Sequence, residues 1–368
     1  MTALAADPAV PRRNALLRPV TMAEVLSKRL HGGVPVERCE RTYVKYRVGE
    51  SVRVVYRYET NGVTRHVSAR TKRTAPAPAV PAPEVGAVLF PFPYDRKLPA
   101  LPALAPGSPT LENLLGKPVT PRLVSYAAEQ SAAAACLDED GRVLAYAKVG
   151  RDDGERRGAE ALAGQDAVRV PKVLARSGDV LLLEALQGRR LDDADALAAL
   201  GRALGRLHAL SLDLPRFERL DPPRLQTAAA VIAKARPDAA AAAERLLDKL
   251  LALPQDGPAV TLHGDVNLRN ALLLADGDVA LLDLEHLASG PAAADLGHVM
   301  AGLLTRRTAA TALLRGYAAV APLPDRAALR WYTAASVLAR VALPAVSRFR
   351  PRALAQLRAL LDAGTELA

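Results

Sequence analysis

Residues 262–273 combine the side-chain types that transfer of a phosphoryl group from a nucleotide requires. Their sequence is LHGDVNLRNALL, in which Asn270 follows Asp265 by five positions. A second carboxylate, Asp283, ends an apolar run thirteen positions after Asn270. An aspartate can orient an acceptor hydroxyl and take its proton, and amide and carboxylate oxygens are ligands that Mg²⁺ prefers. We therefore expect Asp265 to be the catalytic base, and Asn270 and Asp283 to hold Mg²⁺ on the phosphates of ATP.

Asp265 and Asn270 also have structural interpretations. An aspartate could close a turn after the His-Gly pair, and an asparagine could cap that turn. Their spacing, followed by a strand and then Asp283, favours catalysis and metal binding over both. We expect Asp295 to accept backbone N–H groups of the catalytic loop rather than to touch a substrate. His263 is expected to be packed and hydrogen-bonded rather than to act as a base.

Lys148 lies in an apolar strand, residues 143–149, well before the catalytic loop. An inward-facing lysine on a strand is costly unless it is paired, and nucleotide phosphates together with a helix carboxylate would pair it. We choose Glu160 as that carboxylate, with Glu155 as the alternative. A lysine at a solvent-facing strand end is the competing interpretation.

The crossover at residues 183–186, LEAL, is the expected position for the adenine edge, because backbone groups there could bond a base. We therefore place Glu184 and Leu186 in the nucleotide site. A glycine-rich phosphate loop is missing, since the turn at residues 127–130 reads AAEQ and no GxxxxGK[S/T] sequence occurs. Either backbone amides of that hairpin hold the phosphates, or the nucleotide is held more loosely.

The elements that position these residues can be predicted from periodicity. A helix is expected around residues 22–30, and Asn61-Gly62 is a strong hairpin signal. Two sets of three strands are expected, at 42–47, 51–58 and 63–70 and again at 122–126, 131–137 and 143–149. Similar spacing of turn residues suggests that the two sets are related units. Helices are expected at 155–163, 194–210, 227–251, 293–304, 308–318, 325–343 and 351–363.

Proline-rich sequence separates the two strand sets. Residues 74–83, TAPAPAVPAP, are expected to form an extended, semi-rigid spacer. The proline-punctuated stretch at residues 90–109 is expected to lie over a surface rather than to form a core.

Length, charge and cysteine content limit the number of modules, the binding partners and the cellular location that we expect. The 368 residues suffice for two or three modules, and the net charge is +10. Residues 1–73 hold fifteen Lys and Arg against six Asp and Glu, so this module could bind nucleic acid, an acidic partner or a phosphorylated ligand, or carry a solvated strand surface. Two cysteines are too few for a disulfide framework. With no signal peptide or long apolar stretch, we expect a cytoplasmic protein without a membrane span.

From Pro121 to the C-terminus, the chain resembles the aminoglycoside phosphotransferase family, the small-molecule branch of the protein-kinase-like fold. The motifs that carry the resemblance are HGD with its following Asn, LDLE at 282–285, the segment around Asp295, and RWYTAA at 330–335. The resemblance implies that Lys148 contacts ATP, that Asp265 is the base, and that Asn270 and Asp283 bind Mg²⁺. The basic module looks somewhat like the N-terminal caps of actinobacterial maltokinases and glucosamine kinases. That likeness implies a sugar or amino sugar as readily as an aminoglycoside.

We therefore expect an α+β, bilobal protein-kinase-like fold with a β-rich N-lobe and a mainly α-helical C-lobe, preceded by a small basic β-rich module. The expected boundaries are 1–73 for this cap-like module, 74–118 for a Pro/Ala-rich spacer, 119–186 for the N-lobe and 187–368 for the C-lobe. The expected activity is ATP- and Mg²⁺-dependent transfer of the γ-phosphoryl group to a hydroxyl of a small molecule. An inactive nucleotide-binding regulator is an alternative, and a nucleic-acid-binding protein is a less favoured one. The acceptor, ATP against GTP, and the oligomeric state stay open.

Overall fold

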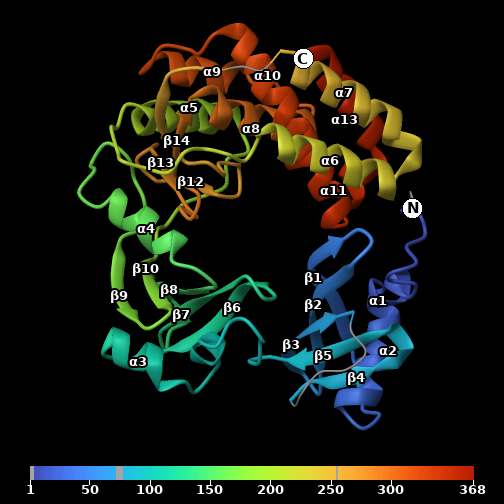
Figure 1. Ribbon diagram of the computed structural model, residues 1–368. Coiled ribbons are helices and arrows are strands. Elements are labelled where there is room, and N and C mark those ends of the chain that lie inside the picture. Colours follow the sequence, from blue (N-terminus) through green and yellow to red (C-terminus); the bar gives the residue numbers. More distant parts are fainter. Residues whose placement is uncertain (1–3, 72–77, 254–255) are drawn as a thin grey trace.

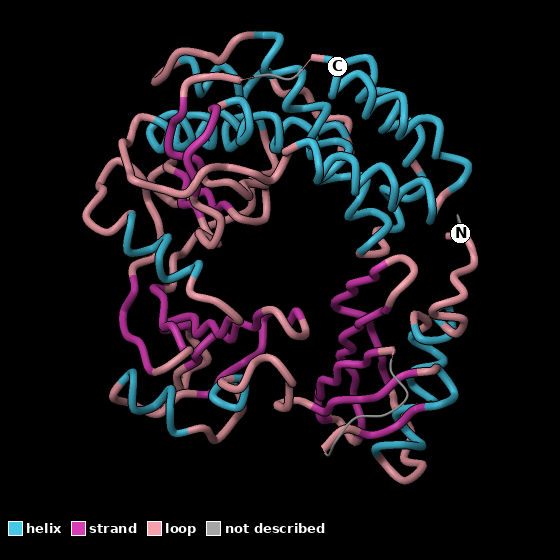
Figure 2. Tube along the Cα trace, in the orientation of Figure 1, coloured by secondary structure: helices cyan, strands magenta, loops and turns pink. Residues whose placement is uncertain are grey.

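The computed structural model describes residues 4–71, 78–253 and 256–368, which form three parts with a ring-like outline (Figure 1). Two β-rich parts lie side by side below a helical part, and strands are scarce in the helical part (Figure 2). The first part contacts both others, because β1 (Arg38–Arg47) packs against α11 (Leu343–Ser347) and β6 (Thr120–Ala127). Among the described residues, no helix has both the length and the apolar character needed to cross a bilayer.

The N-terminal module is an antiparallel sheet with strand order β1-β2-β3-β5-β4, accompanied by two helices. The predicted hairpin is present, because Asn61 and Gly62 both have positive φ between strands β2 and β3. The predicted helix is present as α2, whose Met22 and Leu26 are fully buried. The bounds are α1 (Arg13–Leu16), α2 (Pro19–Leu30), β2 (Ser51–Thr60), β3 (Val63–Arg70), β4 (Val80–Ala82) and β5 (Ala87–Pro91).

The structure corrects the predicted spacer at 74–118. Residues 72–77 lie outside the described residues, but β4 and β5 lie within the predicted spacer and complete the N-terminal sheet. Pro81 is tolerated because β4 is the edge strand, where no ladder hydrogen bond is needed on one side. The stretch at 90–109 is also not confined to a surface. Its leucines Leu98, Leu101 and Leu104 are buried in the core of the second sheet, together with Leu111 of α3 (Pro109–Leu115).

The kinase-type N-lobe is built on a second antiparallel sheet, with order β6-β7-β8-β10-β9. Its strands are β6, β7 (Ser131–Leu137), β8 (Val143–Gly150), β9 (Val173–Ser177) and β10 (Val180–Glu184), and the helix α4 (Gly154–Ala161) follows β8. The first sheet has the corresponding order, with its fifth strand beside the third and its fourth strand at the edge. The shared strand order agrees with the prediction that the two strand sets are related units.

The C-lobe carries the catalytic sequence on short strands among helices. Its elements are α5 (Ala194–His208), α6 (Pro222–Ala235), α7 (Ala240–Ala252), β11 (Ala259–Leu262), β12 (Ala271–Leu273), β13 (Val279–Leu281), β14 (Ala288–Pro291), α8 (Ala293–Leu304), α9 (Thr311–Ala318), α10 (Arg326–Ser336), the π-helical segment η4 (Val337–Ala342), α11, α12 (Pro351–Ala355) and α13 (Leu357–Leu367). The single helix predicted at 227–251 is wrong. Pro237 cannot donate a helical hydrogen bond and divides it into α6 and α7.

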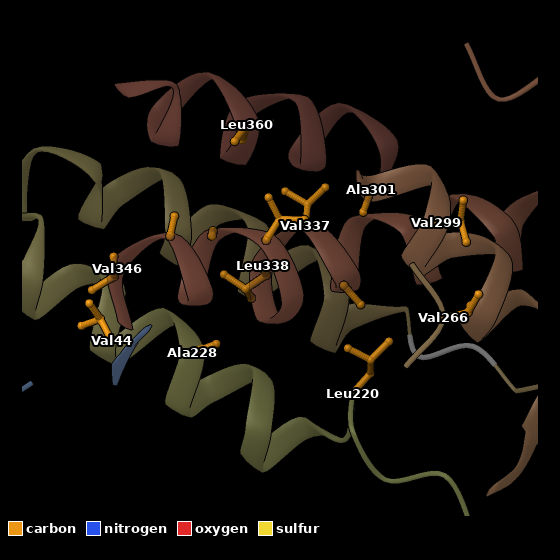
Figure 3. Packing of buried hydrophobic residues seen from close by; sticks show 14 of the residues in the cluster. Val44, Leu220, Ala228, Val266, Val299, Ala301, Val337, Leu338, Val346 and Leu360 are labelled. Atoms are coloured by element: carbon orange, nitrogen blue, oxygen red, sulfur yellow. The ribbon is translucent and has the colours of Figure 1, made fainter. Parts of the chain in front are cut away.

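The core of the helical lobe extends to the N-terminal module. Figure 3 shows Val337 and Leu338 of η4 between Leu360 of α13 and Ala228 of α6. Val44 of β1 lies beside Val346 of α11, and both belong to the same buried cluster. Removing such side chains from water contributes about 1.5–3 kcal/mol each, so this cluster holds the first module against the lobe that carries the catalytic loop.

Candidate functional site

The catalytic loop leaves β11 through a backbone contact that requires glycine. Gly264 has φ +75°. A Cβ on Gly264 would collide with the backbone oxygen of His286, which follows β13 and Asp283 in the chain. This contact places the loop that carries Asp265 directly against the segment that carries Asp283.

Asp295 of α8 fixes the catalytic loop from behind, as predicted. Its buried carboxylate accepts hydrogen bonds from the backbone N–H of His263 (2.7 Å) and of Gly264 (3.0 Å). His208 of α5 lies against the same carboxylate, with Nε2 3.3 Å from Oδ2. Burial alone would raise the pKa of Asp295, but His208, His263 and the backbone donors lower it, so the anion is retained. His263 is buried, and its Nε2 lies 2.9 Å from the backbone oxygen of Leu282, so it is a structural residue, as expected.

Asp265 is held by two arginines that sequence reasoning missed. Arg340 of η4 pairs with its Oδ1 and donates a second hydrogen bond to the backbone oxygen of Gly264 (2.9 Å). Arg219, in the connection before α6, lies 3.4 Å from the same Oδ1. The Asp265 side chain is 27% exposed, so its other face can reach a ligand. Nothing in the sequence pairs Arg340 with Asp265, because the two residues lie 75 positions apart.

The segments that carry Asn270 and Asp283 lie side by side and are bonded through their backbones. Asn270 donates through its side-chain nitrogen to the backbone oxygen of Asp265 (3.2 Å). Its own backbone oxygen accepts from the N–H of Leu282 (2.9 Å), the residue before Asp283. Asp283 has φ +65°, a left-handed conformation that a non-glycine residue adopts only when its surroundings impose it.

The two residues fit a magnesium ion on phosphates. The bonded side-chain nitrogen of Asn270 fixes the amide, and its Oδ1 forms no hydrogen bond within residues 4–71, 78–253 and 256–368. The Asp283 side chain is 38% exposed, and burial, which would raise its pKa, is outweighed by Lys148, so the pKa lies below its ordinary value. One amide and one carboxylate oxygen, completed by phosphates and water, make a donor set typical of Mg²⁺.

Lys148 joins the two lobes at this point. Its Nζ lies 2.5 Å from Asp283 Oδ1 and 2.8 Å from Glu155 Oε2. Burial opposes the ammonium, but Glu155 and Asp283 raise the pKa of Lys148 above its ordinary value. The competing interpretation, a lysine at a solvent-facing strand end, is therefore wrong, since the side chain is 17% exposed and doubly paired.

Glu160, our choice for the lysine's partner, is wrong, and the alternative Glu155 takes that place. Glu155 lies in the first turn of α4, and Glu160 is five residues farther on, about 140° around the helix axis. Glu160 instead pairs with Arg156 (2.6 Å) at the surface. Glu155 also accepts a hydrogen bond from the backbone of Leu284.

Glycines bring α4 close enough for this contact. A Cβ on Gly158 would collide with the backbone oxygen of Leu284, and a Cβ on Gly154 would come within 2.9 Å of that of Glu285. The helix therefore rests directly on the backbone that follows Asp283. Glycine at both positions lets Glu155 lie close to the segment that follows Asp283.

The predicted adenine contacts at Glu184 and Leu186 differ in their surroundings. The side chain of Glu184 is engaged by Arg169 (2.7 Å) and by the backbone N–H of Lys172 (3.2 Å). Leu186 follows β10, and its backbone N–H and C=O form no hydrogen bond within the described chain. The role of Leu186 in base binding stays a prediction. The backbone N–H of Glu184 is engaged as well, since it donates to the backbone oxygen of Lys172 (2.9 Å).

Glu129 replaces the missing glycines in the turn between β6 and β7. It has φ +62° and is buried beneath three arginines, at 2.9 Å from Arg53, 2.8 Å from Arg70 and 3.1 Å from Arg96. Its backbone N–H donates to Asp95 (2.9 Å). Burial would raise the pKa of Glu129, but the arginines hold it below its ordinary value. Because Arg53 and Arg70 belong to the first sheet, the N-terminal module holds the turn expected to face the phosphates.

The candidate site lies mostly within a part of the chain that matches a family of phosphotransferases. Residues 151–332 match the sequence model of a family described as the phosphotransferase enzyme family, APH. The matched range contains Glu155, Asp265, Asn270 and Asp283, and it begins three residues after Lys148. The predicted resemblance to this family is confirmed by that match.

Solved structures show the same fold. A protein from Thermobifida fusca assigned as a fructosamine-3-kinase is 20% identical, with a TM-score of 0.50, and covers 70% of this chain and 97% of its own. Spectinomycin phosphotransferase APH(9)-Ia, solved with ADP and spectinomycin, is 14% identical, with a TM-score of 0.52 and coverage of 70% and 98%. A thermostable mutant of aminoglycoside phosphotransferase APH(4)-Ia is 17% identical, with a TM-score of 0.52 and coverage of 70% and 97%. No curated protein matched the chain. The expected kinase-like fold is confirmed.

Proposed function

We propose that this protein transfers the γ-phosphoryl group of ATP to a hydroxyl of a small molecule, with Mg²⁺. The observation that carries the proposal is the convergence of Lys148, Glu155 and Asp283 with the loop of Asp265 and Asn270. These residues come from β8, α4, the end of β13 and the loop after β11, and backbone contacts lock the segments together.

Each residue has a distinct task in this proposal. Lys148, oriented by Glu155, binds phosphate oxygens of ATP. Asn270 and Asp283 hold Mg²⁺, which neutralises charge on the phosphates. The match to the phosphotransferase family and the ADP found in the spectinomycin phosphotransferase support the choice of a nucleotide donor.

The transfer itself balances with these groups. A bond forms between the acceptor oxygen and the γ-phosphorus, and the bond from that phosphorus to the bridging oxygen of ADP breaks. The acceptor proton passes to Asp265, and ADP leaves. Since Arg340 and Arg219 occupy Oδ1 of Asp265, Oδ2 is the oxygen that accepts the proton.

One observation favours the alternative of a nucleotide-binding regulator. Both carboxylates expected to act in catalysis are already ion-paired, Asp265 with arginines and Asp283 with Lys148. A protein that binds Mg-ATP but phosphorylates nothing across hexoses, amino sugars, sugar acids and amino alcohols would fit that alternative.

The nucleic-acid alternative finds less support, because ion pairs engage part of the basic surplus of the first module. Arg53 and Arg70 pair with Glu129, and Arg57 pairs with Glu40 (2.7 Å). Exposed cations of this module remain, so steep salt dependence of binding to an oligonucleotide is the measurement that would revive the alternative.

The proposal can be tested by ADP release in a coupled assay over that acceptor panel, with Asp283→Asn as the variant. Turnover should require Mg²⁺ and should fall about 10²-fold or more in the variant, because a charged ligand of the phosphate-bound metal is lost. Asp362→Asn on α13, which removes the carboxylate of a surface pair with Arg245 of α7, is the matched control. Turnover that persists in chelator, or in Asp283→Asn, contradicts the proposal.

A further inference from the structure

Two arginines from separate segments contact Asp265, and a third, Arg350, is influenced electrostatically by the same carboxylate. Arg340 lies in η4, Arg219 in the connection between α5 and α6, and Arg350 immediately before α12. Arg219 and Arg340 pair directly with the carboxylate, and Asp265 is also the carboxylate that acts on the pKa of Arg350. η4 is π-helical, a rare geometry that often occurs at functional sites.

Arg340 is committed to positioning Asp265. Its side chain is 6% exposed, and both of its terminal nitrogens donate to the catalytic loop, one to Asp265 Oδ1 and one to the backbone oxygen of Gly264. Burial, and then Arg219, lower the pKa of Arg340 to about 10, so it stays charged at neutral pH. The charge of Arg340 is therefore balanced by Asp265.

Arg219 and Arg350 have guanidinium N–H groups that could bind a ligand. Arg219 is 35% exposed and lies 3.4 Å from Asp265, longer than a well-formed hydrogen bond. The guanidinium of Arg350, which is partly buried, forms no hydrogen bond or ion pair within the described residues. Burial, Arg348 and Arg269 lower the pKa of Arg350 to about 10, so it too remains a cation. A partly buried guanidinium without a partner is costly, and an anionic ligand would offset that cost.

The surroundings do not supply that anion. His298 of α8 has a buried Nδ1 with no hydrogen-bond partner in the described chain, and the same arginines act on its pKa. Burial and the arginines hold the pKa of His298 well below its ordinary value, so the ring is neutral. Asp295, the other carboxylate acting on Arg340, is occupied by His208 and by backbone N–H groups. Asp265, which is 27% exposed, is therefore the carboxylate that pairs with Arg340 and Arg219, and no carboxylate within the described residues pairs with Arg350.

We propose that the acceptor carries an anionic group, a carboxylate or a phosphate, beside the hydroxyl to be phosphorylated, and that Arg219 and Arg350 bind it. The inference rests on the proposed function and narrows its acceptor to hydroxy acids, sugar acids or sugar phosphates. Guanidinium donors match both oxyanions geometrically, in paired hydrogen bonds. Asp265 then takes the proton of a hydroxyl that these two arginines position.

Polycationic acceptors fit this surface poorly. An aminoglycoside would place ammonium groups beside the arginines, where like charges repel. Asp192 and Asp193 are acidic residues near the start of α5, but both pair with Arg189 (2.8 and 2.7 Å). Asp193 also caps α5 through the backbone N–H of Ala196.

The test compares glucose-derived acceptors of different charge in the coupled ADP-release assay with the full chain. Gluconate, the open-chain acid of glucose, and glucose 6-phosphate are anions, glucose is neutral, glucosamine is a monocation, and kanamycin represents the polycations. We expect kcat/KM for gluconate or glucose 6-phosphate to exceed that for glucose and glucosamine at least tenfold. The first two compounds separate a carboxylate acceptor from a phosphate acceptor.

Arg219→Gln and Arg350→Gln should each raise the KM of the favoured anionic acceptor about tenfold or more, with the KM of Mg-ATP unchanged. Arg352→Gln, on the exposed face of α12, is the matched control and should change neither value. If the wild type prefers glucosamine or kanamycin, the proposal of an anionic acceptor is wrong, and the proposed phosphotransferase activity still holds. An equal loss of kcat with every acceptor in both variants also overturns it, because the arginines would then serve the transferred phosphoryl group.

If none of these compounds is phosphorylated, equilibrium binding tests the anion-binding site separately from the proposed phosphotransferase activity. Gluconate and glucose 6-phosphate are titrated into the protein with a non-hydrolysable ATP analogue and Mg²⁺. Binding of either compound that weakens in Arg350→Gln upholds the anion site and refutes the kinase activity. Absence of binding to the wild type refutes the anion site as well.

Discussion

Lys148 Nζ and Asp283 Oδ1 lie 2.5 Å apart, although 135 positions separate these residues along the chain. Lys148 comes from the sheet of the N-lobe, and Asp283 comes from the end of a strand in the C-lobe. The contact therefore joins the proposed phosphate ligand to the proposed metal ligand across the two lobes. Glu155 completes it from α4, and the predictions below begin with that carboxylate.

Glu155→Gln should raise the KM of Mg-ATP about tenfold and lower kcat, because Lys148 loses the carboxylate that orients it. Glu160→Gln, five residues later on the same helix, should leave both constants unchanged, since Glu160 pairs only with Arg156 at the surface. Steady-state kinetics with varied Mg-ATP provide the measurement. Equal effects of the two substitutions would show that the observed pairing is not the functional one.

Gly158→Ala tests the approach of α4 to the metal segment. The new Cβ would meet the backbone oxygen of Leu284, so α4 must shift, at a cost of about 1–3 kcal/mol in the free energy of unfolding. The shift should also raise the KM of Mg-ATP by moving Glu155.

Gly302→Ala in α8 is the matched control, because nothing lies within 4 Å of its added Cβ. It should raise the free energy of unfolding by about 0.4–1 kcal/mol. Denaturant unfolding measures both changes, and equal stability of the two variants would refute the proposed contact.

Glu129→Gln should destabilise the protein by roughly 3 kcal/mol or more, because it leaves three arginines around a buried position without a carboxylate. The KM of Mg-ATP should rise as well, since the turn between β6 and β7 is expected to face the phosphates. Glu139→Gln, at an exposed turn of the same sheet, is the control for both measurements. If Glu129→Gln is destabilised but its affinity for the nucleotide is unchanged, the turn between β6 and β7 does not contribute to nucleotide binding.

The contribution of Glu129 should depend on pH in a defined direction. Its pKa in the folded protein lies below the ordinary value of 4.5, so the unfolded chain binds its proton first as pH falls. The stability that the ionised carboxylate adds is complete at neutral pH and is lost in acid, below about pH 4.5. The difference in free energy of unfolding between wild type and Glu129→Gln should therefore be constant near pH 7 and shrink toward pH 3. A difference that grows in acid would contradict the pairing.

The sequence predicts contacts that a short motif encodes. Asp265, Asn270 and Asp283 lie within nineteen residues, on a turn followed by the β12–β13 hairpin, so a local sequence motif predicts that they are near one another. Lys148 was also predictable, because an apolar strand that contains a lysine requires a partner. The same local reasoning found the Asn61-Gly62 hairpin and α2.

Contacts that depend on packing between distant segments were not predictable. The choice between Glu155 and Glu160 depends on which face of α4 meets Leu284, and two glycine contacts determine that face. Arg340 and Arg219 reach Asp265 from separate elements, and no local pattern marks either arginine. The prolines of residues 74–118 suggested a spacer, but the apolar residues between them complete the first sheet and enter the core of the second.

Asp265→Asn tests the central claim most directly, because it keeps the size and most hydrogen bonds of the side chain and removes its capacity to accept a proton. Mg-ATP affinity is measured by titration, and turnover is measured by ADP release with the best acceptor of the panel. We predict that the affinity for Mg-ATP stays within about threefold of wild type and that kcat falls by about 10²–10⁴. A kcat near that of wild type in Asp265→Asn would contradict the account.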